Sequence, residues 1–211
     1  VWCLKERGAF IMTKKEILAL YMPVIRPHLS EKRYEHSVNV AKEAGKLAEK
    51  YGADVEKAVT AGILHDIMKD TPPAEQLKFM QQWGIILSDV EKNAPKLYHA
   101  MCGAGYLEHE LQITDPEILS AVRYHTTARA GMSLVEKIVF LADFISIDRD
   151  YPGVEQMRKL AYRDLMDAII EGLGYTIGDL ASHYAPIHPD TVAAFNEALL
   201  THPKLPHKKG K

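Results

Sequence analysis

Apolar residues recur along most of the chain at the three- and four-residue spacing of amphipathic helices, and runs that alternate apolar with polar residues are scarce. Between Ser30 and Gly52, for example, Val38, Ala41 and Ala44 fall on one helical face. Serine is a frequent N-cap residue and glycine a frequent helix terminator, so these two residues bound a long helix. The periodicity predicts an all-α protein.

Start and stop signals divide the rest of the chain into further helices. Proline in a first turn favours helix starts near Thr71-Pro72-Pro73, Pro95 and Asp115-Pro116, and Ser133 with Glu136 matches a capping box. We predict helices over residues 14–22, 30–51, 54–66, from 72, from 95, 115–125, 133–145, 154–172 and 190–200. The first is expected to stop before Pro23. Repeats and linkers are not evident, which predicts one helical bundle.

Several ionisable residues lie in or beside apolar helical stretches. His65-Asp66 follows the apolar stretch 55–64, and Asp143 interrupts another between Ile138 and Ile145. Buried ionisable side chains are rare unless they are paired or hold a metal. One shared metal centre would explain six such residues together: His36, His65, Asp66, His99, His125 and Asp143.

The chemistry of this set indicates the kind of metal. The six residues come from different predicted helices, as in metal sites built inside helical bundles. Histidine and aspartate without thiolates suit iron, manganese, cobalt or zinc. Six ligands exceed what one catalytic ion takes from protein, so two ions that share Asp66 as a bridge would accommodate them and suit phosphoryl hydrolysis.

Polar residues near the predicted ligands could bind a phosphorylated substrate. Lys69 follows Asp66 by one helical turn, and Arg33 precedes His36 by one turn, so each is expected to share a face with a ligand. We assign Lys69 a catalytic role beside Asp66. The full set of predicted substrate contacts is Arg33, Lys69, Thr126, Thr127, Arg129 and Arg149. Solvated surface charges, or a helix cap in the case of the threonines, remain the alternatives.

Short motifs around these residues resemble a known family. His36, His65-Asp66 and Asp143 resemble the HD-domain metal-dependent phosphohydrolase superfamily, which has an all-α fold. The flanking residues are similar to its YqeK group, from about Lys14 to Ala198. The motifs are Arg33-Tyr34-Glu35-His36-Ser37, Ala61-Gly62-Ile63-Leu64-His65-Asp66, Tyr124-His125-Thr126-Thr127, Gly131-Met132-Ser133-Leu134-Val135-Glu136-Lys137, Leu141-Ala142-Asp143 and Arg149-Asp150-Tyr151-Pro152-Gly153-Val154. The run 145–149 and Ala128 depart from the group's usual residues.

The resemblance implies a symmetrical bis(5′-nucleosyl)-tetraphosphatase that cleaves diadenosine tetraphosphate into two ADP by metal-activated water, with iron as a favoured metal. It implies that His36, His65, Asp66 and Asp143 hold one ion. His99 and His125 match positions associated with a second ion or a bound phosphate, and a supporting hydrogen-bond role stays open for both. Two alternatives remain: a nucleoside mono-, di- or triphosphate phosphohydrolase on the same metal core, and a non-catalytic nucleotide sensor.

Composition restricts the partners. The chain has 26 Lys and Arg against 28 Asp and Glu, a net charge of −2, so no basic field predicts nucleic-acid binding. No uncharged run approaches the ~18 residues of a membrane span. Only two cysteines occur, which suits a reducing cytoplasm. We expect residues 1–12 to be an N-terminal extension, 13–200 the HD domain and 201–211 a flexible basic tail. A homodimer stays open.

Overall fold

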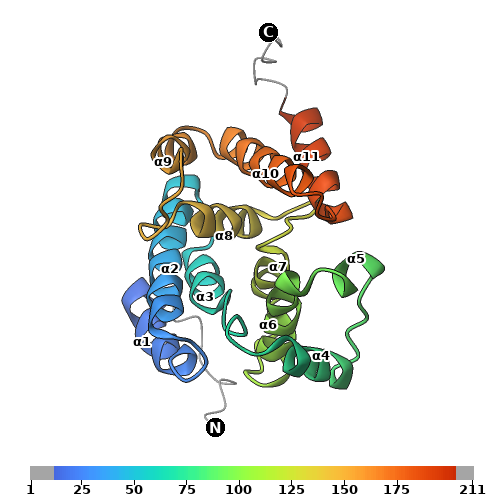
Figure 1. Cartoon of the computed structure of the whole chain (residues 1–211). Coiled ribbons are helices and arrows are strands. Elements are labelled where there is room, and N and C mark those ends of the chain that lie inside the picture. Colours follow the sequence, from blue (N-terminus) through green and yellow to red (C-terminus); the bar gives the residue numbers. More distant parts are fainter. Residues whose placement is uncertain (1–11, 203–211) are drawn as a thin grey trace.

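A computed structural model describes residues 12–202 of the chain, which form eleven α-helices and one short 3-10 helix without a β-strand (Figure 1). The all-α prediction is confirmed. The helices are α1 Lys14–Ile25, α2 Glu31–Tyr51, α3 Val55–Leu64, α4 Pro73–Gln82, α5 Asp89–Lys92, η1 Pro95–Leu97, α6 Tyr98–His109, α7 Pro116–Tyr124, α8 Leu134–Ile145, α9 Val154–Arg163, α10 Leu165–Ser182 and α11 Pro189–Thr201. The expected N-terminal extension and basic tail lie outside these residues, apart from Met12, Thr201 and His202.

The middle of the bundle consists of α2, α3, α7 and α8, with α9, α10 and α11 together at one end (Figure 1). Helix α3 packs against α2, α7 and α8, and α6 packs against α7. Large apolar side chains such as Ile63, Leu64 and Phe140 are buried there almost completely. This core brings residues that are distant in sequence close to one another at the carboxyl ends of α3 and α7.

Helices α2 and α3 approach each other closely at Gly62. A Cβ atom at this position would lie 2.9 Å from the Cα atom of Ala41 and 3.3 Å from its backbone nitrogen. Backbone atoms of a packed helix cannot yield as a flexible side chain can. Glycine therefore sets the distance between the two helices just before the chain reaches His65.

Several helix boundaries differ from the sequence prediction, and α10 continues to Ser182 although the sequence predicts an end at residue 172. Helix α1 continues past Pro23 to Ile25, whose side chain is fully buried, so packing outweighs the hydrogen bond that proline removes. Helix α3 ends at Leu64, and residues 65–70 form turns. The expected helix 154–172 is broken at Asp164, whose extended backbone precedes α10 and whose carboxylate accepts hydrogen bonds from the first turn of α10.

None of the helices within residues 12–202 is both long enough and apolar enough to span a membrane.

The carboxyl end of α10 gives a stability prediction. Tyr184 follows the helix with φ 53°, and its side chain is 97% exposed. The N–H groups of Tyr184 and Ala185 donate to the carbonyls of Ala181 and Leu180, the pattern of a Schellman motif in which glycine is usual. We expect Tyr184→Gly to stabilise the fold by about 1 kcal/mol, because glycine lacks the left-handed penalty.

That gain corresponds to a melting temperature about 2–4 °C higher in a calorimetric scan. Tyr184→Ala is the control, since alanine keeps the penalty and loses no buried contact. A glycine variant that melts no higher than the alanine variant would contradict this reading.

Candidate metal centre

The six predicted ligands converge from five segments of the bundle. His36 lies on α2, His65 and Asp66 directly follow α3, His99 lies on α6, His125 directly follows α7, and Asp143 lies on α8. The four histidines and Asp66 are at most 4% exposed, and the Asp143 side chain is 17% exposed. The bundle therefore gathers four imidazoles and two carboxylates in one place.

The six side chains form two overlapping groups. Ligand atoms of His36, His65 and Asp143 lie within 4.8 Å of one another, and so do those of His65, Asp66 and His125. His36 Nε2 lies 2.9 Å from Asp143 Oδ1, and His65 Nε2 lies 3.8 Å from the same oxygen. His65 is common to both groups.

Asp66 presents its two carboxylate oxygens to different neighbours. Its Oδ1 atom lies 3.2 Å from His99 Nε2 and 3.5 Å from His125 Nε2, whereas its Oδ2 atom lies 3.5 Å from His65 Nε2. Asp66 therefore lies beside three of the four imidazoles, two of them at Oδ1 and one at Oδ2.

Two histidines turn Nδ1 toward a backbone carbonyl and Nε2 toward the other predicted ligands, where His125 Nε2 lies 3.2 Å from His99 Nε2. Nδ1 of His65 lies 2.8 Å from the Gly62 carbonyl oxygen, and Nδ1 of His125 lies 2.8 Å from that of Val122. A carbonyl only accepts, so Nδ1 must carry the proton and Nε2 a lone pair. His65 Nε2 and Asp66 Oδ1 are buried without a hydrogen-bond partner among residues 12–202. Buried orphaned acceptors are costly, and a divalent cation among them would satisfy both.

The protonation states of His99 and of the two carboxylates also suit a cation. Burial disfavours the imidazolium and lowers the pKa of His99 to about 4, although Asp66 acts in the opposite direction. Burial opposes ionisation of Asp66 and Asp143, but the adjacent imidazoles, with Arg149 for Asp143, outweigh it and hold the pKa of both carboxyls below its usual range. At neutral pH the site thus offers a neutral His99 and two carboxylates, as metal binding requires.

Three of the predicted substrate contacts lie at this cluster. Arg33 NH1 lies 3.4 Å from Asp66 Oδ2, and Lys69 Nζ lies 3.1 Å from His99 Nε2. The Arg149 guanidinium donates to the Asp143 carboxylate and lies 3.4 Å from His36 Nε2. The turn after α3, rather than a continued helix, places Lys69 there, because its N–H donates to the Asp66 carbonyl.

The structure does not bring Arg129 to the cluster. Its guanidinium forms two hydrogen bonds with the buried Glu136 carboxylate on α8, at 2.7 and 2.9 Å. Thr126 and Thr127 follow His125 directly, and their hydroxyl groups are buried and have no hydrogen-bond partner in the described residues. The Thr127 carbonyl accepts from Thr191 on α11, so the threonine segment connects the predicted ligand to the C-terminal helices.

Sequence reasoning missed the role of Asp148. Its Oδ2 atom lies 2.6 Å from His36 Nδ1, so the carboxylate orients the imidazole toward Asp143. A carboxylate behind a ligating histidine is a recurrent supporting arrangement. Its position next to Arg149, a predicted substrate contact, was the one indication in the sequence that Asp148 lies at the site. Because 112 residues separate Asp148 from His36, the local sequence pattern could not predict that the two are in contact.

Helix α9 holds the segment that bears Asp148. Arg158 donates to the backbone carbonyls of Ile145, Ser146 and Arg149, at 2.9, 2.7 and 2.8 Å. The three bonds fix the turn after α8, and with it both Asp148 and Arg149.

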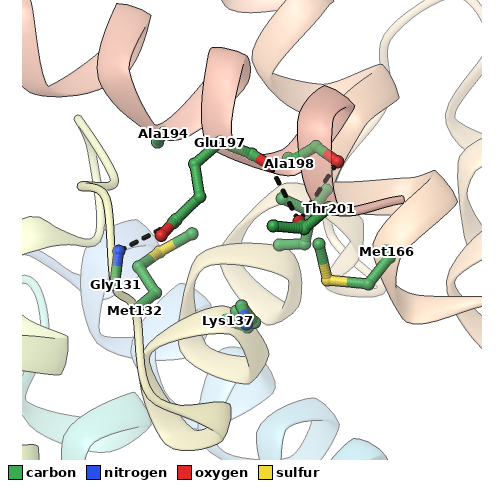
Figure 2. A pocket seen from close by; sticks show the side chains of 9 residues that line it. Gly131, Met132, Lys137, Met166, Ala194, Glu197, Ala198 and Thr201 are labelled. Atoms are coloured by element: carbon green, nitrogen blue, oxygen red, sulfur yellow. Dashed lines mark hydrogen bonds between the residues drawn. The ribbon is translucent and has the colours of Figure 1, made fainter. Parts of the chain in front are cut away.

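A cavity of about 260 Å³ lies elsewhere, among α8, α10, α11 and the loop before α8. Figure 2 shows Glu197 reaching toward Gly131, whose N–H donates to the Glu197 carboxylate at 2.7 Å, with Met132 beside them. None of its 9 lining residues belongs to the predicted ligand set. We therefore place the chemistry at the histidine cluster.

Comparison with known proteins agrees with this geometry. The family profile described as HD domain matches residues 33–148, a span that includes all six predicted ligands. The chain belongs to the HD-domain family. This confirms the resemblance inferred from the motifs, and HD-domain hydrolases bind divalent metals.

Relatives of this HD-domain chain match it over most of its length. It is 43% identical over 179 residues to a protein of Halalkalibacterium halodurans named symmetrical bis(5′-nucleosyl)-tetraphosphatase, covering 85% of this chain and 95% of the relative. A Bacillus subtilis protein of the same name is 38% identical over 185 residues, 88% and 97% of the two chains.

A solved structure has the same fold. The crystal structure of a predicted HD superfamily hydrolase involved in NAD metabolism from Clostridium acetobutylicum has a TM-score of 0.82 and 32% identity to this HD-domain chain. It covers 91% of this chain and 100% of that one.

The Asp148 contact gives a prediction for metal affinity. Asp148→Ala removes the acceptor of His36 Nδ1, so the imidazole loses its orientation, and we expect metal binding to weaken by about 10- to 100-fold. Titration of the metal-free protein with Mn²⁺ or Fe²⁺ measures the change. Asp150→Ala, two residues away, is the matched control, and equal affinities in the two variants would contradict the role of Asp148.

Proposed function

We propose that the chain hydrolyses diadenosine tetraphosphate symmetrically into two ADP molecules at a divalent metal centre. The observation that most directly supports this is the nearly full-length, 43% identical relative that is named symmetrical bis(5′-nucleosyl)-tetraphosphatase. The buried cluster of four histidines and two aspartates supplies the matching chemistry. We take iron as the metal and the cytoplasm as the setting.

His36, His65, Asp66, His99, His125 and Asp143 would hold the metal, with Asp66 between two ions. Divalent ions supply two kinds of chemistry when bound: they polarise phosphate oxygens and lower the pKa of water toward neutrality. The imidazole and carboxylate donors suit iron, and also manganese, cobalt or zinc. Asp148 and the carbonyl of Gly62 orient two of the imidazoles.

Three cations of the chain would bind the polyphosphate around this centre. Arg149 lies beside Asp143 and His36, whereas Arg33 and Lys69 lie beside Asp66 and His99. Burial lowers the pKa of Lys69, and the Asp66 carboxylate acts against that shift. Lys69 would donate a hydrogen bond to the departing phosphate and so stabilise the charge that develops there.

The bond changes are those of hydrolysis at the central anhydride. Water adds to one of the two inner phosphorus atoms, and the bond from that phosphorus to the central bridging oxygen breaks. The bridging oxygen leaves with the other half of the molecule, so both products are ADP. Arg33, Lys69 and Arg149 hold the phosphate oxygens in place while the charge moves to the leaving group.

A substrate panel tests the proposal. Metal-loaded protein is incubated separately with diadenosine tetraphosphate, ATP, ADP and AMP, and free phosphate, pyrophosphate and nucleotides are resolved. We expect turnover of the dinucleotide to exceed that of every mononucleotide, without release of phosphate. Faster release of phosphate or pyrophosphate from a mononucleotide would favour a nucleotide phosphohydrolase, and binding without turnover of any of the four would favour a sensor.

A further inference from the structure

A cavity of about 440 Å³ opens beside the metal centre, between the turn after α3 and the short helix η1. His99 and Lys69 are among the residues that line it, so the cavity adjoins the cluster of predicted ligands. Lys96 lines the cavity from η1 and is exposed. It is outside the set of substrate contacts that the sequence suggests.

The charge of this cavity fits a phosphorylated ligand. Arg33, Lys69 and Lys96 contribute three cations, and no carboxylate is among the residues that line it. Arg33 and Lys69 already contact Asp66 or His99, whereas Lys96 comes from η1. A chain of phosphates that extends from the metal centre into the cavity would therefore contact Lys96 as well as Lys69.

Gln76 adds a second, independent indication of a ligand. It lines the same cavity from α4 and is 3% exposed. Its Nε2 atom donates to the Thr71 carbonyl oxygen at 2.5 Å, which fixes the orientation of the amide. Within the part of the chain that the structure describes, its Oε1 atom is buried without a hydrogen-bond partner. An acceptor in this position calls for a donor, such as a ribose hydroxyl or the amino group of a base.

We propose that this cavity binds one nucleotide half of the dinucleotide substrate, with Lys96 on a phosphate beyond the cleaved bond and Gln76 Oε1 on a donor of the nucleoside. This inference rests on the proposed function and deepens it. Lys96 and Gln76 are then specificity residues that determine the affinity for the substrate and therefore KM. The metal centre determines the rate at which the central anhydride bond breaks and therefore kcat.

The test compares variants of the metal-loaded protein on diadenosine tetraphosphate. We expect Lys96→Ala to raise KM by about tenfold with less than a twofold change in kcat, since a contact equal in ground and transition states affects KM alone. Lys96→Arg keeps the charge and should restore most of the affinity. Lys78→Ala removes an exposed lysine of α4 that does not line the cavity, and should leave KM unchanged.

The dependence of KM on salt concentration distinguishes a phosphate contact of Lys96 from a purely structural role of this residue. The KM of the unaltered protein should rise with KCl, and this rise should be smaller in Lys96→Ala because one phosphate contact is gone. Gln76→Met keeps the size of the side chain and removes its acceptor, so KM should rise several-fold at a similar kcat.

The outcomes separate the two proposals. An unchanged KM in Lys96→Ala, or a fall in kcat that Lys96→Arg does not restore, overturns the subsite while ADP formation by the unaltered protein upholds the proposed function. An unchanged KM in Gln76→Met overturns the nucleoside contact. Failure of the unaltered protein to produce ADP overturns the proposed function and the subsite together.

Discussion

Asp66→Ala is expected to abolish metal binding and to lower turnover by at least about a thousandfold, because it removes the carboxylate that lies beside three of the four imidazoles of the centre. Asp66 Oδ1 faces His99 and His125, and Oδ2 faces His65. Asp143, the other predicted carboxylate ligand, lies beside His36 and His65 instead. Metal content of the purified variant and ADP formation from diadenosine tetraphosphate measure the two effects.

Asp89→Ala is the control for this variant. The Asp89 side chain is 94% exposed and pairs only with Lys92 within residues 12–202, so its loss should change neither metal content nor turnover. A correctly folded Asp66→Ala protein with full activity would rule out the metal centre as the site of the reaction.

Gly62→Val should destabilise the fold by about 3 kcal/mol, because a branched side chain there meets the backbone of α2 at Ala41. The carbonyl of Gly62 also accepts the hydrogen bond from His65 Nδ1. Separation of α2 from α3 would therefore move both His36 and His65, and we expect metal affinity to fall with stability. Urea denaturation with and without metal measures both.

The matched control is Gly178→Val on α10. A Cβ atom at Gly178 meets nothing within 4 Å, so the same chemical change should alter stability by less than about 0.5 kcal/mol. Equal stability of the two valine variants would show that Gly62 does not set the distance between α2 and α3.

The helices and most of the centre follow from local patterns in the sequence. Capping signals at Ser133 and Asp115 do begin α8 and α7, and the apolar stretch before His65 is indeed buried. The six ionisable residues in or beside such apolar stretches would be costly to bury singly, and one shared metal centre explains the burial of all six. That argument located the six side chains, and their roles as ligands stay predictions for the variants above.

Features that depend on packing between distant segments could not be inferred in the same way. Asp148 orients His36 across 112 residues, and the cavity at Lys96 forms only where the turn after α3 meets η1. Pro23 remains helical because Ile25 is buried, which local propensity does not register. Arg129 has the guanidinium expected of a phosphate contact, but Glu136 on α8 binds it instead.

The most direct test of the central claim is hydrolysis of diadenosine tetraphosphate in ¹⁸O-labelled water by anaerobic, iron-loaded protein. The products are separated by ion-exchange chromatography, and their ¹⁸O content is determined by mass spectrometry. We predict ADP as the sole product, with half of the ADP molecules carrying one heavy oxygen on the terminal phosphate. AMP together with ATP, or no turnover with any divalent metal, would contradict symmetrical hydrolysis at this centre.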